Sequence, residues 1–111
     1  MALFGSNKPV LEIKGAVIGE FDPAVEGFYK NVVPFRFEVK KNRVLHTSVR
    51  SDGLVDVALI DEKGSPVTHV DRQTSLEIDA HTGSSREMSI ILGVYPGDKV
   101  VVDAEIWMCK K

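Results

Sequence analysis

Three histidines, His46, His69 and His81, are the side chains of this 111-residue sequence best suited to metal binding or proton transfer. A zinc site needs three or four converging nitrogen or sulfur ligands. The histidines belong to different expected elements, no two of them have the spacing H-x-x-x-H, and Cys109 is the single cysteine. We therefore interpret them as unrelated surface histidines, and we expect neither a metal nor another cofactor.

Paired carboxylates can do acid–base chemistry when they face one cleft. Four acids of two expected strands instead alternate with apolar residues and belong on a solvated side: Glu77, Asp79, Asp103 and Glu105. No serine stands in a Gly-x-Ser-x-Gly setting, and no Gly-x-Gly-x-x-Gly loop occurs. No catalytic set remains, so we do not expect an enzyme.

Composition argues against several classes of partner. Fourteen Lys and Arg against sixteen Asp and Glu give a net charge of −2, which leaves no basic surplus to hold nucleic acid. The one basic cluster, residues 40–43, is typical of a polar turn. No apolar run approaches the roughly 20 residues that span a bilayer. The first nine residues lack the apolar stretch of a secretory signal, and a lone thiol fits a reducing compartment, so we expect a cytoplasmic protein.

The elements that position these groups have a period of two, which is typical of strands. Val33, Phe35, Phe37 and Val39 alternate with other residues that are mostly charged, which predicts a half-buried antiparallel strand. Pro34 cannot donate a ladder hydrogen bond, so this strand begins there or lies at a sheet edge. Similar rows recur in six further segments: residues 11–17, 45–49, 54–60, 75–80, 87–94 and 99–108.

Turn-forming residues separate these rows, at residues 40–43, 51–53, 61–64, 81–86 and 95–98. The last of these places Pro96 and Gly97 at the central positions of a type II turn. About eight strands at a spacing of about ten residues are typical of a sandwich or barrel. We therefore predict an all-β fold, an antiparallel two-sheet β-sandwich of about eight strands with a jelly-roll-like arrangement, which forms a single domain over residues 1–111.

Residues 20–31 depart from the strand pattern. Asp22 and Pro23 suit the start of a helix, and Val25, Phe28 and Tyr29 recur at helical spacing. A helix of one or two turns and a structured loop with aromatic residues both fit this segment, and the sequence does not decide between them.

Trp107 is out of place on a solvated strand side. Its register puts it beside Asp103 and Val101 on the polar side of the last strand, and Ile91 has the corresponding place in the preceding strand. If these two strands pair as a hairpin, Trp107, Ile91 and Val101 form an apolar patch. Such patches mark interfaces, where tryptophan is enriched. The alternative is that the N-terminal segment or residues 20–31 cover the patch within the monomer.

A longer pattern of strands and turns covers residues 33–108. It consists of Phe35-Arg-Phe-Glu-Val, Val44-Leu-His-Thr-Ser-Val, Ser51-Asp-Gly, Val55-Asp-Val-Ala-Leu-Ile-Asp, Lys63-Gly64, Ser75-Leu-Glu-Ile-Asp, Met88-Ser-Ile-Ile-Leu and Val100-Val-Val-Asp-Ala-Glu-Ile. This pattern resembles a GOLD-type domain, the β-sandwich of the Emp24/p24 cargo proteins, and bacterial pre-peptidase C-terminal domains share much of it. The resemblance implies a GOLD-like sandwich used as a protein-binding module. We expect no role in cargo traffic, because the signal peptide, cysteine pair, stem and anchor of p24 proteins have no counterpart in this sequence.

We therefore expect a non-enzymatic protein-binding or assembly module that self-associates through the sheet face with Trp107, with a homo-oligomer as its simplest form. Two alternatives stay open. A carbohydrate-binding module would stack sugars on exposed rings, for which Trp107, Phe28, Tyr29 and Tyr95 are available. A jelly-roll structural subunit would build a larger shell or fibre.

Overall fold

The computed structural model describes the backbone of residues 8–21 and 29–110 and the side chains of residues 8–19 and 31–109. Over these residues the chain consists of strands and their connections. The strands are β1 (Leu11–Ile18), β2 (Glu20–Phe21), β3 (Tyr29–Lys30), β4 (Val32–Glu38), β5 (Arg43–Ile60), β6 (Pro66–His81), β7 (Glu87–Gly93) and β8 (Val100–Lys110).

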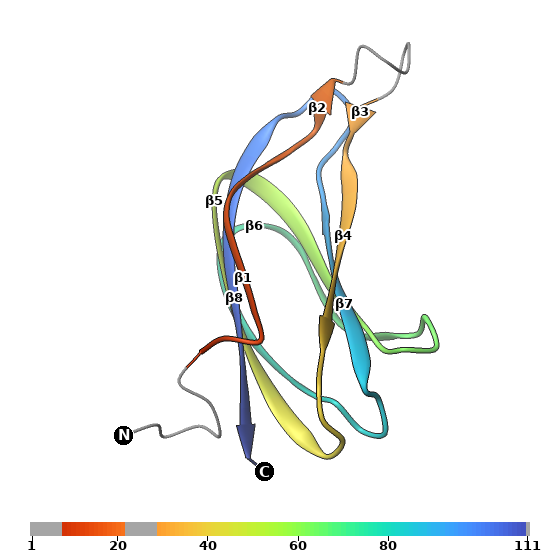
Figure 1. Ribbon diagram of the computed structural model, residues 1–111. Coiled ribbons are helices and arrows are strands. Elements are labelled where there is room, and N and C mark those ends of the chain that lie inside the picture. Colours follow the sequence, from red (N-terminus) through yellow and green to blue (C-terminus); the bar gives the residue numbers. More distant parts are fainter. Residues whose placement is uncertain (1–7, 22–28, 111) are drawn as a thin grey trace.

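Six of these strands form one antiparallel sheet, in the order β1-β8-β5-β7-β4, with β6 paired to the other edge of β5. The short strands β2 and β3 pair with each other. This confirms the predicted all-β, antiparallel fold. The sequence had predicted two separate sheets. The hydrogen bonding joins these six strands into one sheet. β1 and β8 lie together, β4 and β7 lie together, and β5 and β6 contribute to both parts of a curled sheet (Figure 1).

Strand β5 makes this arrangement possible because it is 18 residues long. Its first half, residues 43–51, pairs with β8, and its second half, residues 56–60, pairs with β7. The predicted turn at residues 51–53 is therefore wrong. The chain bends there without reversing: the Ser51 hydroxyl donates to the Gly53 carbonyl oxygen at 2.6 Å. Serine and glycine are common in turns, but they also occur at bends and bulges within strands.

Strand β6 was predicted only for residues 75–80, and it extends over 16 residues. Its first half is polar enough to hide the strand period. A break in the ladder at Arg72, with a φ of 52°, contributes to that irregularity. The Arg72 backbone N–H donates to an oxygen of Asp56 at 2.8 Å, and its guanidinium lies 3.8 Å from the centre of the Tyr95 ring. The first contact joins the bend of β6 to β5, and the second joins it to the turn between β7 and β8.

The turn at residues 95–98 has the predicted type. The backbone N–H of Asp98 donates to the carbonyl oxygen of Tyr95 at 3.0 Å, and Gly97 has the positive φ, 93°, that a type II turn requires. The flanking strands nevertheless do not form a hairpin, because β7 pairs with β4 and β5 whereas β8 pairs with β1 and β5. The bend in β5 sends its two halves in different directions, and each half takes one of these strands.

The predicted apolar rows meet in one core between the two parts of the sheet. Phe37, Leu45, Leu59 and Ile90 are among the buried residues, and Phe35 packs against them. As predicted for Pro34, β4 lies at an edge and pairs only with β7. Among the described side chains, the buried apolar set is Ile13, Ile18, Phe37, Val39, Leu45, Val49, Val55, Val57, Leu59, Leu76, Ala80, Met88, Ile90, Leu92, Val94, Val100, Val102, Ala104 and Ile106.

The choice between helix and loop for residues 20–31 lies largely outside the described residues. The ends of that segment form the β2–β3 pair, and residues 22–28, including Asp22 and Pro23, are not described. Among the residues that are described, no helix is long and apolar enough to cross a membrane.

Candidate functional site

The curled sheet has two outer faces of different chemistry. We call the outer side of β1, β8, the first half of β5 and the second half of β6 the polar face. It carries Lys14, His46, Ser48, Arg50, Glu77, Asp79, Val101, Asp103, Glu105 and Trp107. We call the outer side of β4, β7, the second half of β5 and the first half of β6 the apolar face. It carries Val32, Pro34, Ala58, Ile60, Val67 and Ile91, together with the polar residues Arg36, Asp56, His69 and Asp71.

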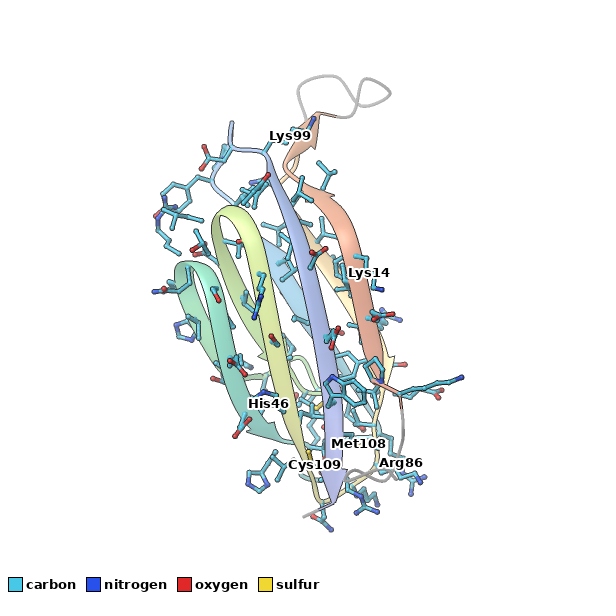
Figure 2. The ribbon with its side chains drawn as sticks, turned by 90° about the vertical axis from the view of Figure 1, so that its left-hand side faces the viewer. Lys14, His46, Arg86, Lys99, Met108 and Cys109 are labelled. Atoms are coloured by element: carbon cyan, nitrogen blue, oxygen red, sulfur yellow. The ribbon has the colours of Figure 1, made fainter. Side chains whose placement is uncertain are left out.

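His46 lies on β5 in the lower part of the polar face, which Figure 2 shows from outside. Its Nδ1 lies 2.7 Å from an oxygen of Asp79, and its Nε2 lies 3.0 Å from an oxygen of Glu77. Carboxylates only accept hydrogen bonds, so both ring nitrogens donate when the ring carries two protons. The hydrogen bond to Asp79 is the main cause that raises the pKa of His46 above its ordinary value, and the bond to Glu77 acts in the same direction against partial burial.

Trp107 lies beside this cluster, since it is the register partner of His46 on the neighbouring strand. It is half-buried, and its indole N–H donates to an oxygen of Glu105 at 3.1 Å. Val101 is 39% exposed, and its backbone N–H donates to Asp52. Trp107 and Val101 therefore share the polar face, as predicted, but in polar surroundings.

A shallow hollow of about 540 Å³ opens on the same face beside β1. Lys14, Arg50, Asp103 and Ser48 are among the residues that line it, so it mixes both signs of charge. The Ser48 hydroxyl is next to His46 on this face, but both nitrogens of that ring are engaged by carboxylates. This arrangement does not present a nucleophile with a free base.

Ile91 lies on the apolar face, away from Trp107 and Val101. Its register partners are Pro34 on β4 and Ala58 on β5. The patch that sequence analysis assembled from Ile91, Val101 and Trp107 is thus not formed, because it required β7 and β8 to pair. The structure separates these three residues onto two faces.

The apolar face is built from residues that sequence analysis did not combine. Val32 is 63% exposed and Val67 is 39% exposed. Val32, Ala58 and Ile91 also help to line a hollow of about 390 Å³, whose lining includes Asp56, His69 and Asp71 as well. The available signal was that apolar residues of β5, such as Ala58 and Ile60, alternate with the core row and therefore point to the other side of the sheet.

The remaining candidates are dispersed. The Nε2 of His69 lies 3.8 Å from an oxygen of Asp71, and no group of three or more metal-ligating side chains gathers among the described residues. Of the rings considered for stacking sugars, Trp107 is half-buried and Tyr95 lies under the Arg72 guanidinium. Phe28 and the side chain of Tyr29 lie outside the described residues.

Comparisons with known proteins identify the fold. No family model matches the chain, and no curated protein sequence matches it. The pre-peptidase C-terminal domain of a collagenase from Bacillus anthracis is similar in structure, with a TM-score of 0.65 and 13% sequence identity over 88% of this chain and 89% of that one. PliG of Aeromonas hydrophila, a periplasmic inhibitor of g-type lysozyme, has a TM-score of 0.62 and 10% identity over 96% and 92% of the two chains.

A carbohydrate-binding module solved with calcium and xylotriose superposes less closely, with a TM-score of 0.45 and 14% identity over 89% of this chain and 99% of that one. At these identities the first two comparisons establish a shared β fold. None of these three structures is a GOLD domain, so the GOLD resemblance stays a prediction. The cytoplasmic location also stays a prediction.

Proposed function

We propose that this protein is a non-enzymatic protein-binding module whose contact surface is the apolar face. The observation that carries the proposal is the exposure of Val32, at 63%, on a face that also presents Ala58, Ile60 and Ile91. Solvated sheet faces normally alternate polar residues with the core row. Exposed apolar residues that are grouped on one face are typical of a contact surface, and Asp56, His69 and Asp71 would supply polar contacts beside them.

The alternative contact surface, the polar face, fits a buried interface less well. Its carboxylates and its imidazole already bind one another, and each would lose water if a partner covered it. Trp107 and Val101 are the apolar residues on this face, and the Trp107 indole N–H donates to Glu105. The comparison with PliG supports a protein as partner, because that similar fold belongs to an inhibitor of an enzyme.

The simplest partner is a second copy of the chain. In a two-fold dimer the same patch meets itself, so one apolar face is sufficient for both subunits. Such a dimer would cover Val32, Val67 and Ile91 and leave the polar face in solvent.

Two matched variants test this proposal. Val32→Lys and Val101→Lys each place one charge at an exposed valine, on the apolar and on the polar face respectively. Light scattering over a concentration series measures the mass of both variants and of the unaltered protein. We expect a dimer that Val32→Lys dissociates and that Val101→Lys leaves intact. Dissociation by Val101→Lys alone would move the interface to the Trp107 face, and a strict monomer at every concentration would overturn self-association.

A further inference from the structure

The side chain of His46 forms a bridge between two neighbouring strands. One imidazole from β5 contacts two carboxylates of β6, at 2.7 Å and 3.0 Å, on alternate residues of that strand. Asp79 is the register partner of His46, and Glu77 is the partner of Ser48, two residues along β5. The ring therefore joins the two strands over a length of three residues.

Strand β6 has few other attachments. Its only ladder within the described residues is the one with β5, since β6 lies at the edge of the sheet. That ladder has irregularities between residues 50 and 57 of β5, so the second half of β6 is connected separately from the first. The side-chain bridge consequently reinforces a single edge of main-chain pairing.

The other titratable groups near His46 come from both neighbouring strands. On β6 they are Glu77 and Asp79, with His81 at the next outward position. On β8 they are Glu105 and Cys109, which stand on either side of Trp107. No cation other than His46 forms an ion pair with Glu77 or Asp79 among the described side chains.

We propose that His46 is a pH-sensitive clasp that holds the second half of β6 against β5. When the ring carries two protons, it donates to both carboxylates at once. When it loses one proton, the free nitrogen becomes an acceptor and faces a carboxylate that can only accept. One of the two bridges is then lost, and the second half of β6 opens more often. This inference is independent of the proposed binding function, because it concerns the other face.

Linkage gives the clasp a quantitative form. The ring binds its second proton more tightly when β6 is docked than when β6 is open, which agrees with the raised pKa of His46. Each unit by which docking raises that pKa corresponds to about a tenfold shift of the opening equilibrium between acid and alkaline pH. The rise in the pKa of His46 and the change of the opening equilibrium with pH must therefore agree in magnitude.

Two NMR measurements on the full chain test this agreement. The first is a titration of the His46 ring. The second is hydrogen exchange of the amides in residues 76–80 at about pH 6 and pH 9, corrected for intrinsic rates. Residues 67–71 of the same strand are the matched control. We expect His46 to titrate above about 6.5 and protection to fall about tenfold per unit of that rise in residues 76–80 only.

The variant His46→Gln separates the clasp from a general effect of pH. Glutamine can donate to one carboxylate, but it does not titrate, so residues 76–80 should exchange with the same protection at both pH values. The clasp is overturned if His46 titrates at or below its ordinary value. It is also overturned if the fall in protection persists in His46→Gln or is equal in residues 67–71. If His46→Gln does not fold, Glu77→Gln, which should lower the pKa of His46 and reduce the fall in protection, provides the same test.

Discussion

The two outer faces of the sheet share strands β5 and β6 and differ in chemistry. β5 shows this most directly, since its outward residues are His46, Ser48 and Arg50 in the first half and Asp56, Ala58 and Ile60 in the second. The inward residues of both halves are alike, and Leu45 and Leu59 are both completely buried. The comparison shows that the fold is determined by the inner row, while the outer row is free to take up a function.

The largest expected loss of stability tests whether the inward residues of the two halves of β5 are equally well packed. Leu45→Ala and Leu59→Ala should each lower the free energy of unfolding by about 2–5 kcal/mol, because each leaves a cavity in the shared core. Chemical denaturation measures both. If one variant cost less than about 1 kcal/mol, the two halves would not belong to one equally packed core.

Thr47 is a polar residue within the otherwise apolar inner row of the first half of β5. It is fully buried, and its hydroxyl oxygen has no hydrogen-bond partner among the described residues. Thr47→Val replaces the hydroxyl by a methyl group of similar size and should raise the free energy of unfolding by about 1–2 kcal/mol. Ser48→Ala is the neighbouring control on the outer side, where a change within about 0.5 kcal/mol is expected. A destabilised Thr47→Val protein would mean that the hydroxyl has a partner.

The Arg72 guanidinium, at the bend of β6, stacks on the ring of Tyr95. Tyr95→Leu should cost about 0.5–1 kcal/mol, since the ring is exposed and the cation is only partly desolvated. Tyr95→Phe retains the ring and should retain most of this stability. Thermal unfolding of both variants measures the difference, and equal losses would assign the effect to the phenol hydroxyl instead.

The smallest expected effect is the dependence of global stability on pH. Folding raises the pKa of His46, so this residue contributes stability that is fully present below about pH 6.5 and is lost as the pH rises through the folded value. The difference in stability between the unaltered protein and His46→Gln should therefore be larger at pH 6 than at pH 9. The contribution is modest, because the His46 side chain is 41% exposed. A difference that grew towards alkaline pH would contradict the assignment.

The sequence was sufficient to identify the residues of the inner rows. It was insufficient to show how the strands that carry them are connected and paired. Alternation identified Phe37, Leu45 and Ile90 as core because burial on one side leaves a period of two. Ser51 and Gly53 predicted a turn, since local turn propensity does not distinguish a reversal from a bend in a long strand. This error separated the two halves of β5.

The same limitation affected the candidate site. Ile91 was correctly placed outside the core, but its neighbours depend on which strand β7 pairs with, and that is a long-range property. His46 was interpreted as an unrelated surface histidine, because the carboxylates that bind it lie more than 30 residues away in the chain. No spacing within a single segment could have joined them.

The length of β5 also has a consequence for the order of folding. The β5–β6 hairpin closes over a connection of only residues 61–65, so its pairing is the most local in the large sheet. β7 follows soon after in the chain and can dock on the second half of β5, whereas β8 joins the first half last. During synthesis the apolar face is therefore assembled first. Leu45 and Val49 therefore lack their register partners on β8, Met108 and Ala104, until the last strand leaves the ribosome.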